Sequence, residues 1–261
     1  MIADRKPTRR VIFLGASNLV RSISTVVETA RQIWREPIEI MAAIGHGRSY
    51  GRDSSLLGRK ISGIFPSVLW KDLQTRPPLP TVALVTDVGN DLGYGVGVSE
   101  LVSWVDGCLD HLQKAQATTI VTELPLARLE RLRDHEFLLF RSLYFPKSRL
   151  TLADIRARAG ALNDSLVELG GRRKIPVIPV SGAWYGFDPI HLKRSSWKHA
   201  WPTILSAWHD RDPNSVRPRT SFARWSYLRS LAPAERTFLG WQRRAQQPCG
   251  VLRDGTTISL Y

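Results

Sequence analysis

The stretch VIFLGASNLVRS, residues 11–22, decides the architecture that the sequence predicts. Its first half is an apolar, β-branched run typical of a buried strand, and its second half has the apolar spacing of a helix. The two halves meet at Gly-Ala-Ser-Asn, with no longer loop between them. Two interpretations of Ser17 are open at this point. Either Ser17 or Asn18 caps the helix, or Ser17 is a nucleophile at the carboxyl end of a strand, where open α/β sheets build their sites.

Four more apolar runs have the same strand-like character, at 38–44, 81–89, 118–125 and 176–181. Each is nearly continuous, as expected of strands that are covered on both faces. Helical spacing occupies residues 19–36, 99–115 and 151–171, and a further helix is expected at 195–205. This alternation predicts a three-layer α/β/α fold with a mostly parallel, five-stranded sheet in the flavodoxin-like order 2-1-3-4-5.

The alternation of predicted strands and helices also suggests how the chain is divided into domains. Residues 1–208 are expected to form the α/β domain, in which the segment 126–150 interrupts the step from strand to helix and is interpreted as a lid. Residues 209–261 are basic, contain Trp225 and Trp241, and are interpreted as an extension packed on that domain. Their last residues, VLRDGTTISLY, place Asp-Gly between apolar runs, which predicts a hairpin.

Composition narrows the range of partners. The chain has 261 residues and a net charge of +14, and a basic balance can serve nucleic acid, an anionic membrane or an anionic substrate. No helix-turn-helix, zinc-finger or RNP pattern accompanies the charge, so nucleic-acid binding is not expected. The polar start, MIADRKPTRR, resembles neither a signal peptide nor a membrane span, and a cytoplasmic protein is expected. The oligomeric state is left open.

The two cysteines carry no metal-ligand pattern. Cys108 and Cys249 lie far apart and have no CxxC or Cys/His spacing around them. Free, structural thiols are therefore expected, with no metal and no organic cofactor.

Polar residues follow four of the predicted strands. Ser17 follows the first, GHGRSYG (45–51) the second, GND (89–91) the third and WYGFDPIHL (184–192) the fifth. In a parallel sheet these positions share one edge and can converge on one crevice. In chain order they present Ser, Gly, Asn and His, and over residues 11–205 the chain resembles the SGNH hydrolases, the GDSL-like esterase superfamily.

The resemblance implies a serine hydrolase acting on carboxylic esters or in related acyl transfer. It implies Ser17 as nucleophile, His191 as base and Asp188 as the partner of that base. It also implies an oxyanion hole built from Ser17, Gly47 and Asn90. These residue types suit the chemistry, because a hydroxyl needs a base, an imidazolium needs a carboxylate, and a developing oxyanion needs fixed donors. The chain departs from the family at Ala16, where an aspartate is usual, and at Val88, where a glycine is frequent.

Two other interpretations stay open. GRSYG (47–51) fits Gly-x-Ser-x-Gly, the nucleophile elbow of α/β-hydrolases, with Ser49 as the candidate. A binding protein on the same fold could also have lost turnover.

The substrate is expected to be a small ester, and four residues are candidates to bind it: Arg48, Tyr94, Trp184 and Tyr185. An anionic ester is favoured if the arginines near the expected crevice face it, and otherwise they form a solvated basic surface. These arginines are Arg48, Arg52, Arg128, Arg131, Arg133 and Arg141.

Overall fold

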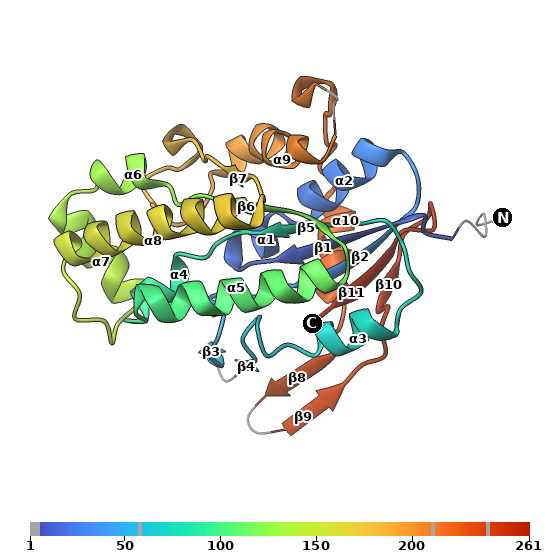
Figure 1. Ribbon diagram of the computed structural model, residues 1–261, viewed down its shortest axis with the longest axis horizontal. Coiled ribbons are helices and arrows are strands. Elements are labelled where there is room, and N and C mark those ends of the chain that lie inside the picture. Colours follow the sequence, from blue (N-terminus) through green and yellow to red (C-terminus); the bar gives the residue numbers. More distant parts are fainter. Residues whose placement is uncertain (1–5, 57–58, 210–211, 239–240) are drawn as a thin grey trace.

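A seven-stranded sheet forms the centre of the computed structural model, which describes residues 6–56, 59–209, 212–238 and 241–261 (Figure 1). The strand order is β10-β11-β2-β1-β5-β6-β7, and all neighbours are parallel except β10 and β11. The strands are β1 (Arg9–Leu14), β2 (Ile38–Ala43), β5 (Thr81–Val85), β6 (Thr118–Thr122), β7 (Val177–Ile178), β10 (Gly250–Val251) and β11 (Thr257–Leu260).

The α/β class and the order of the five predicted strands are confirmed, since β2-β1-β5-β6-β7 is the order 2-1-3-4-5. The predicted strand number is wrong. The C-terminal residues form the predicted hairpin, β10 with β11, and β11 then pairs in parallel with β2. An uncovered β2 would leave a row of unpaired N–H and C=O groups, and β11 satisfies them.

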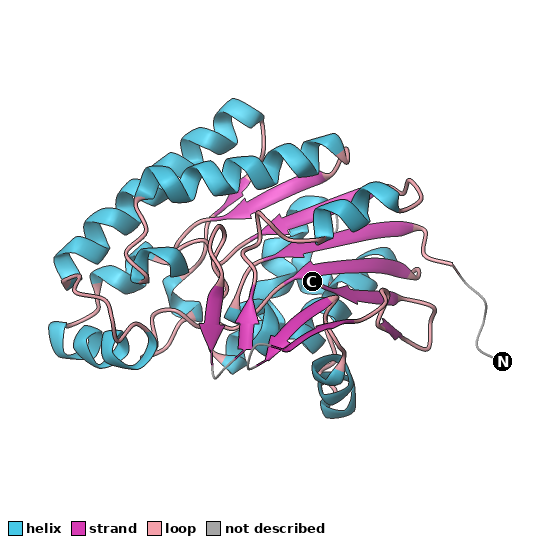
Figure 2. Ribbon diagram, turned by 90° about the horizontal axis from the view of Figure 1, so that it is seen from below, coloured by secondary structure: helices cyan, strands magenta, loops and turns pink. Residues whose placement is uncertain are grey.

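Helices cover both faces of the sheet, giving three layers (Figures 1 and 2). Val11 and Phe13 of β1 pack with α2 (Ile23–Trp34) and α9 (Trp197–Leu205), while Ile12 and Leu14 pack on the other side with α5 (Val98–Lys114) and α8 (Leu152–Arg173). The alternation follows from the two-residue period of a strand. The predicted helices at 99–115, 151–171 and 195–205 correspond to α5, α8 and α9, and the 19–36 stretch forms α1 (Ser17–Arg21) and α2.

The remaining elements lie around this core. The other α-helices are α3 (Leu69–Thr75), α4 (Asn90–Gly93), α6 (Leu126–Glu130), α7 (Asp134–Tyr144) and α10 (Phe222–Ser230). Short 3-10 helices are η1 (Gly182–Trp184), η2 (Arg194–Ser196), η3 (Ser206–Trp208) and η4 (Pro213–Ser215). A second, antiparallel sheet has the order β3-β4-β8-β9, from β3 (Ser54–Leu56), β4 (Arg59–Ile61), β8 (Glu235–Phe238) and β9 (Trp241–Arg244).

The segment 126–150 contains α6 and α7, which lie with α4 at one end of the molecule (Figure 1). Leu132, Phe137, Phe140 and Leu152 form a small apolar cluster there, separate from the two core layers. Among the helices that the structure describes, none is long and apolar enough to cross a bilayer.

Candidate active site

Ser17 lies at the tight junction between β1 and α1. Gly15 permits the junction, because a Cβ at this position would come within 2.9 Å of Leu19 and of Thr86. The cap of α1 comes from the turn after β5: Asp87 Oδ2 accepts hydrogen bonds from the backbone N–H groups of Ala16 (3.0 Å) and Asn18 (3.1 Å). The Ser17 hydroxyl is therefore not needed as a cap and is available for another partner.

That partner is His191. The distance from Ser17 Oγ to His191 Nε2 is 2.8 Å, and the distance from His191 Nδ1 to Asp188 Oδ2 is 2.6 Å. Burial acts to raise the pKa of Asp188, but the hydrogen bond and charge of His191, together with the backbone N–H groups of Ile190 and His191, outweigh it and hold that pKa below its ordinary value. An ionised carboxylate can only accept, so Nδ1 donates to Asp188 and Nε2 is left to accept the Ser17 hydroxyl hydrogen.

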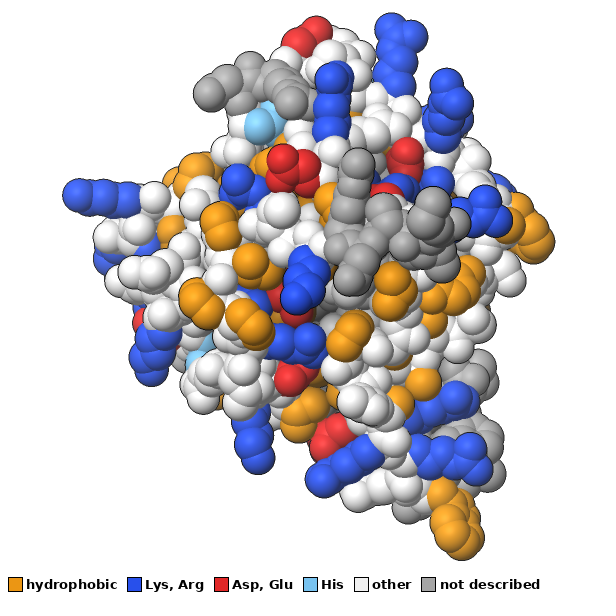
Figure 3. Space-filling model, turned by 90° about the vertical axis from the view of Figure 1, so that its right-hand side faces the viewer, with side chains coloured by type: hydrophobic (Ala, Val, Ile, Leu, Met, Phe, Trp, Pro, Cys, Tyr) orange, Lys and Arg blue, Asp and Glu red, His pale blue; other side chains and the backbone are white. Residues whose placement is uncertain are grey.

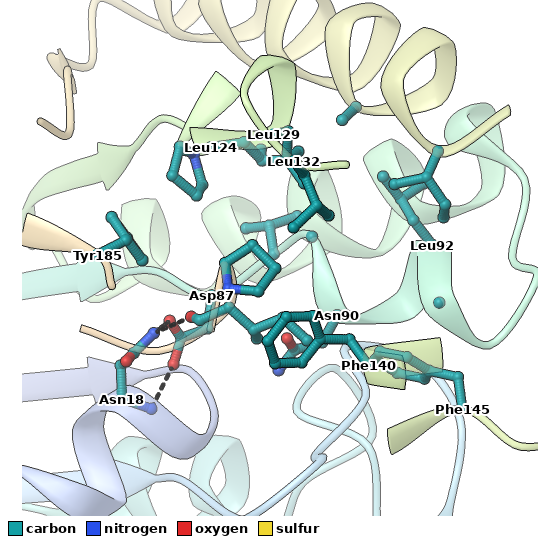
Figure 4. Close-up of a pocket in the computed structure, with 18 of the residues that line it drawn as sticks. Asn18, Asp87, Asn90, Leu92, Leu124, Leu129, Leu132, Phe140, Phe145 and Tyr185 are labelled. Atoms are coloured by element: carbon teal, nitrogen blue, oxygen red, sulfur yellow. Dashed lines mark hydrogen bonds between the residues drawn. The ribbon is translucent and has the colours of Figure 1, made fainter. Parts of the chain in front are cut away.

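A second pair of polar side chains, Asn18 and Asp87, ties the Ser17 turn to the His191 loop. Asn18 Nδ2 donates to Asp87 Oδ1 (2.8 Å) and to the carbonyl of Ile190 (3.0 Å), and Asn18 Oδ1 accepts from the N–H of Leu192 (2.8 Å). Asn18 thus holds the loop on both sides of His191 (Figure 4 shows the Asn18–Asp87 contacts). Burial raises the pKa of Asp87 above its ordinary value.

Sequence reasoning considered Asn18 only as a cap and did not single out Asp87. The available signal was an acidic residue near the end of the apolar run 81–89, together with the missing aspartate at Ala16.

Gly47 and Asn90 reach the same place from two other strand ends. Both line a cavity of about 440 Å³, here called the Ser17 cavity, together with Ser17 and His191. Gly47 has a left-handed φ of 62°, and a Cβ would come within 2.6 Å of the Tyr94 hydroxyl, so glycine suits this position. The Asn90 side-chain amide has no hydrogen-bond partner among the residues in the described ranges. The rest of the lining is Arg21, His46, Tyr94, Leu143, Tyr144, Phe145 and Ile190.

Solved structures share this architecture. A carbohydrate acetylesterase family member from Sinorhizobium meliloti matches with a TM-score of 0.53 and 14% identity, over 77% of this chain and 96% of that chain. Acetyl xylan esterase AlAXEase matches with a TM-score of 0.50 and 13% identity, over 76% and 98%. The fold is that of the SGNH hydrolases. No protein-family model and no curated protein sequence matches the chain.

The SGNH fold places three further side chains around the Ser17 cavity that sequence reasoning missed. The ring of Tyr144, from α7, meets that of His191 edge-on at 5.5 Å, and its hydroxyl is 3.4 Å from Asp188 Oδ2. Arg21 Nη1 lies 4.0 Å from the same oxygen. His46 Nε2 lies 3.0 Å from Arg229 Nη1. No local pattern marks Tyr144, because α7 is remote in sequence from Ser17 and His191. Arg21 lies four residues after Ser17, and His46 directly precedes Gly47.

The four candidate substrate contacts have different positions in this SGNH fold. Tyr94 lines the Ser17 cavity and donates to the Gly47 carbonyl (3.0 Å). Tyr185 lines a neighbouring apolar cavity. Trp184 is buried in the core layer of α2 and α9, so it does not reach the site. Arg48 is 1% exposed and donates to the carbonyls of Ser62 and Tyr261, which corrects the expectation that it binds substrate.

The alternative nucleophile Ser49 is also contradicted. Ser49 is 2% exposed, and its hydroxyl accepts from the N–H groups of Gly51 (3.2 Å) and Arg52 (2.9 Å). It lies in the loop between β2 and β3, whereas a nucleophile elbow joins a strand to a helix. Ser49 therefore stabilises a turn. Within the described part of the SGNH fold, no group of three or more His, Cys, Asp or Glu side chains is placed to hold a metal ion.

Proposed function

We propose that this protein is a serine hydrolase that cleaves carboxylic esters, using Ser17, His191 and Asp188. One observation carries the proposal: the 2.8 Å contact of Ser17 Oγ with His191 Nε2, backed by the 2.6 Å contact of Nδ1 with Asp188. Similarity in fold to esterases agrees with it. Nucleophile, base and orienting carboxylate in this order are the requirements for nucleophilic attack by serine.

The proposed reaction has two halves. His191 accepts the hydroxyl proton as Ser17 Oγ attacks the ester carbonyl carbon, and the carbonyl oxygen becomes an oxyanion. The N–H groups of Ser17 and Gly47 and the Asn90 amide would stabilise that charge. His191 then gives the proton to the leaving alcohol, which leaves an acyl group on Ser17. Water, activated by His191, releases the acid and restores the serine.

The alcohol side of the substrate is proposed to carry negative charge. A basic groove of about 730 Å³ shares Arg21 and His46 with the Ser17 cavity. Its lining also includes Arg194, Lys198 and Arg229 and, among the residues that the structure describes, no Asp or Glu. A groove of one sign concentrates an anionic substrate.

These cations differ from the arginines that the sequence suggested. Arg52 pairs with Glu100 (2.8 Å), Arg133 pairs with Glu136 (3.3 Å), and Arg128 and Arg141 donate to backbone carbonyls.

A labelling experiment tests the nucleophile. Ser17→Ala should abolish covalent labelling by a serine-directed fluorophosphonate and lower kcat for p-nitrophenyl esters by several orders of magnitude, because members of such a set act as a unit. Ser49→Ala is the matched control and should still be labelled. Labelling that survives in Ser17→Ala but is lost in Ser49→Ala would reverse the assignment. Wild-type protein that is neither labelled nor active would favour a binding protein instead.

A further inference from the structure

An apolar cavity lies directly beside the Ser17 cavity, beneath the segment 126–150. Its volume is about 120 Å³. Figure 4 shows Leu124, Leu129, Leu132, Phe140 and Phe145 around it, with the Asp87–Asn90 turn below. The apolar side chains that line it are Val88, Leu92, Leu124, Pro125, Leu129, Leu132, Phe137, Phe140, Phe145, Ile155, Ala159, Tyr185, Pro189 and Ile190.

The polar groups along this cavity are largely engaged elsewhere. Asp87 accepts from Ala16 and Asn18, and the hydroxyls of Thr86 and Thr122 bond to each other at 2.8 Å. Arg141 donates to the Leu150 carbonyl (3.0 Å). A polar occupant would therefore find few partners, whereas an apolar one would be removed from water at a gain in free energy.

The apolar cavity and the Ser17 cavity share Asn90, Phe145 and Ile190. Of the apolar cavity, the Ser17 cavity and the basic groove, Ser17 and His191 line the Ser17 cavity alone, and the Ser17 cavity also adjoins the basic groove. An ester bound at Ser17 with its carbonyl oxygen at Asn90 has two arms. The alcohol must lie near His191, which protonates it as it leaves. The acyl arm is then the one directed past Asn90 toward the apolar cavity.

We propose that the apolar cavity binds the acyl chain of the substrate and selects an unbranched chain of about four to six carbons over acetyl. The inference rests on the proposed esterase function and adds the identity of the acyl group. The volume of the apolar cavity sets the expected chain length. An apolar protein cavity of about 150 Å³ holds benzene, which has six carbons, so about 120 Å³ suits a slightly smaller group. Acetyl would leave most of this space empty.

Two substrate series separate the two arms. In the first, p-nitrophenyl esters from acetate to decanoate vary only the acyl chain. kcat/KM should rise about fourfold per added methylene, reach a maximum at four to six carbons, and then fall as the cavity is filled. In the second, acetate esters of ethanol to octanol vary only the alcohol, and kcat/KM should change much less with length.

Variants of the lining test the cavity directly. Ala159 is buried in α8 and lines the cavity, so Ala159→Leu should lower the hexanoate-to-acetate ratio of kcat/KM at least tenfold. Ala161 lies exposed on the same helix, and Ala161→Leu is the matched control that should keep the wild-type ratio. Should Ala159→Leu fail to fold, Leu129→Ala enlarges the cavity and should move the optimum to longer chains.

The outcomes distinguish a failure of the acyl-chain assignment from a failure of the proposed esterase function. Hydrolysis with a maximum at acetate, or a length profile that both lining variants leave unchanged, overturns the acyl assignment while the esterase proposal stands. A strong dependence on alcohol length instead of acyl length also overturns it. Absence of hydrolysis together with absence of Ser17 labelling overturns the proposed function and this inference with it.

Discussion

The pKa of His46, which lies beside the site, is set by its surroundings. Burial, and next the positive charge of Arg229, lower its pKa from 6.5 to about 4. The imidazole is therefore neutral at neutral pH, and its Nε2 can accept the hydrogen bond from Arg229. A neutral His46 adds no charge to the Ser17 cavity.

This shift predicts a pH dependence of stability. Below about pH 6.5 the unfolded chain protonates His46 while the folded protein does not, so unfolding is favoured increasingly as pH falls toward 4. The contribution is smaller than the roughly 3 kcal/mol that corresponds to the full shift, because the partly exposed ring is screened by solvent. His46→Gln should therefore lose less unfolding free energy than wild type between pH 6.5 and 4, measured by urea denaturation. Parallel losses in the two proteins would show that the folded-state pKa of His46 is not lowered.

Elements meet at the site because parallel strands end at one edge of the sheet. β1 leads to Ser17, β2 to Gly47, β5 to Asn90, and the loop after β7 to His191. The loop has little regular structure of its own to place His191. Asn18, at the start of α1, connects this loop to the turn after β5 through three side-chain hydrogen bonds.

Asn18 is therefore expected to position the base. Asn18→Ala should lower kcat about a hundredfold with little change in KM, because a shift of about 1 Å in a reacting group has that effect. Thr29→Ala is a control, since it removes a buried hydrogen bond of α2, to the Thr25 carbonyl, away from the site. Both variants should lose thermal stability, but only Asn18→Ala should lose kcat. Equal kcat values would leave Asn18 with a purely structural role.

At the scale of the whole molecule, the net charge of +14 is spread widely. Figure 3 shows many Lys and Arg side chains dispersed over a face at the end of the molecule opposite α6 and α7. The charge as a whole therefore does not point to the site. The basic groove is a local feature, set by Arg21, Arg194, Lys198 and Arg229.

The salt dependence of kcat/KM distinguishes an effect of the basic groove from an effect of the net charge. For an ester with a phosphorylated alcohol, kcat/KM should fall more steeply between about 0.1 M and 1 M salt than for its neutral isostere, since the Debye length shortens from about 10 Å to about 3 Å. Arg194→Gln/Lys198→Gln should reduce that slope.

The control variant is Lys71→Gln/Arg243→Gln, which removes equal charge from α3 and β9 and should keep the wild-type slope. Equal slopes for the two esters would remove the case for an anionic substrate.

The SGNH fold could be predicted from local sequence because its signals are local. Continuous apolar runs mark the buried strands, helical spacing marks the covering layers, and the polar residues after each run fall on one edge. Ser17, Gly47, Asn90 and His191 line one cavity for that reason. Asp188 needs only a three-residue spacing to reach His191.

Only the tertiary structure determined the features that depend on segments remote in sequence, namely the burial of Arg48 and Ser49, the added strand β11 and the apolar cavity. Arg48 and Ser49 directly follow Gly47, yet both are buried. The carbonyls of Ser62 and Tyr261 hold the Arg48 side chain inside the protein, and the N–H groups of the following turn hold the Ser49 hydroxyl. β11 joins the sheet because the edge of β2 is open to it. The apolar cavity exists because α6, α7 and α8 cover the end of the sheet. Burial and hydrogen-bond partners are properties of the packed chain, so residue type and spacing alone do not determine them.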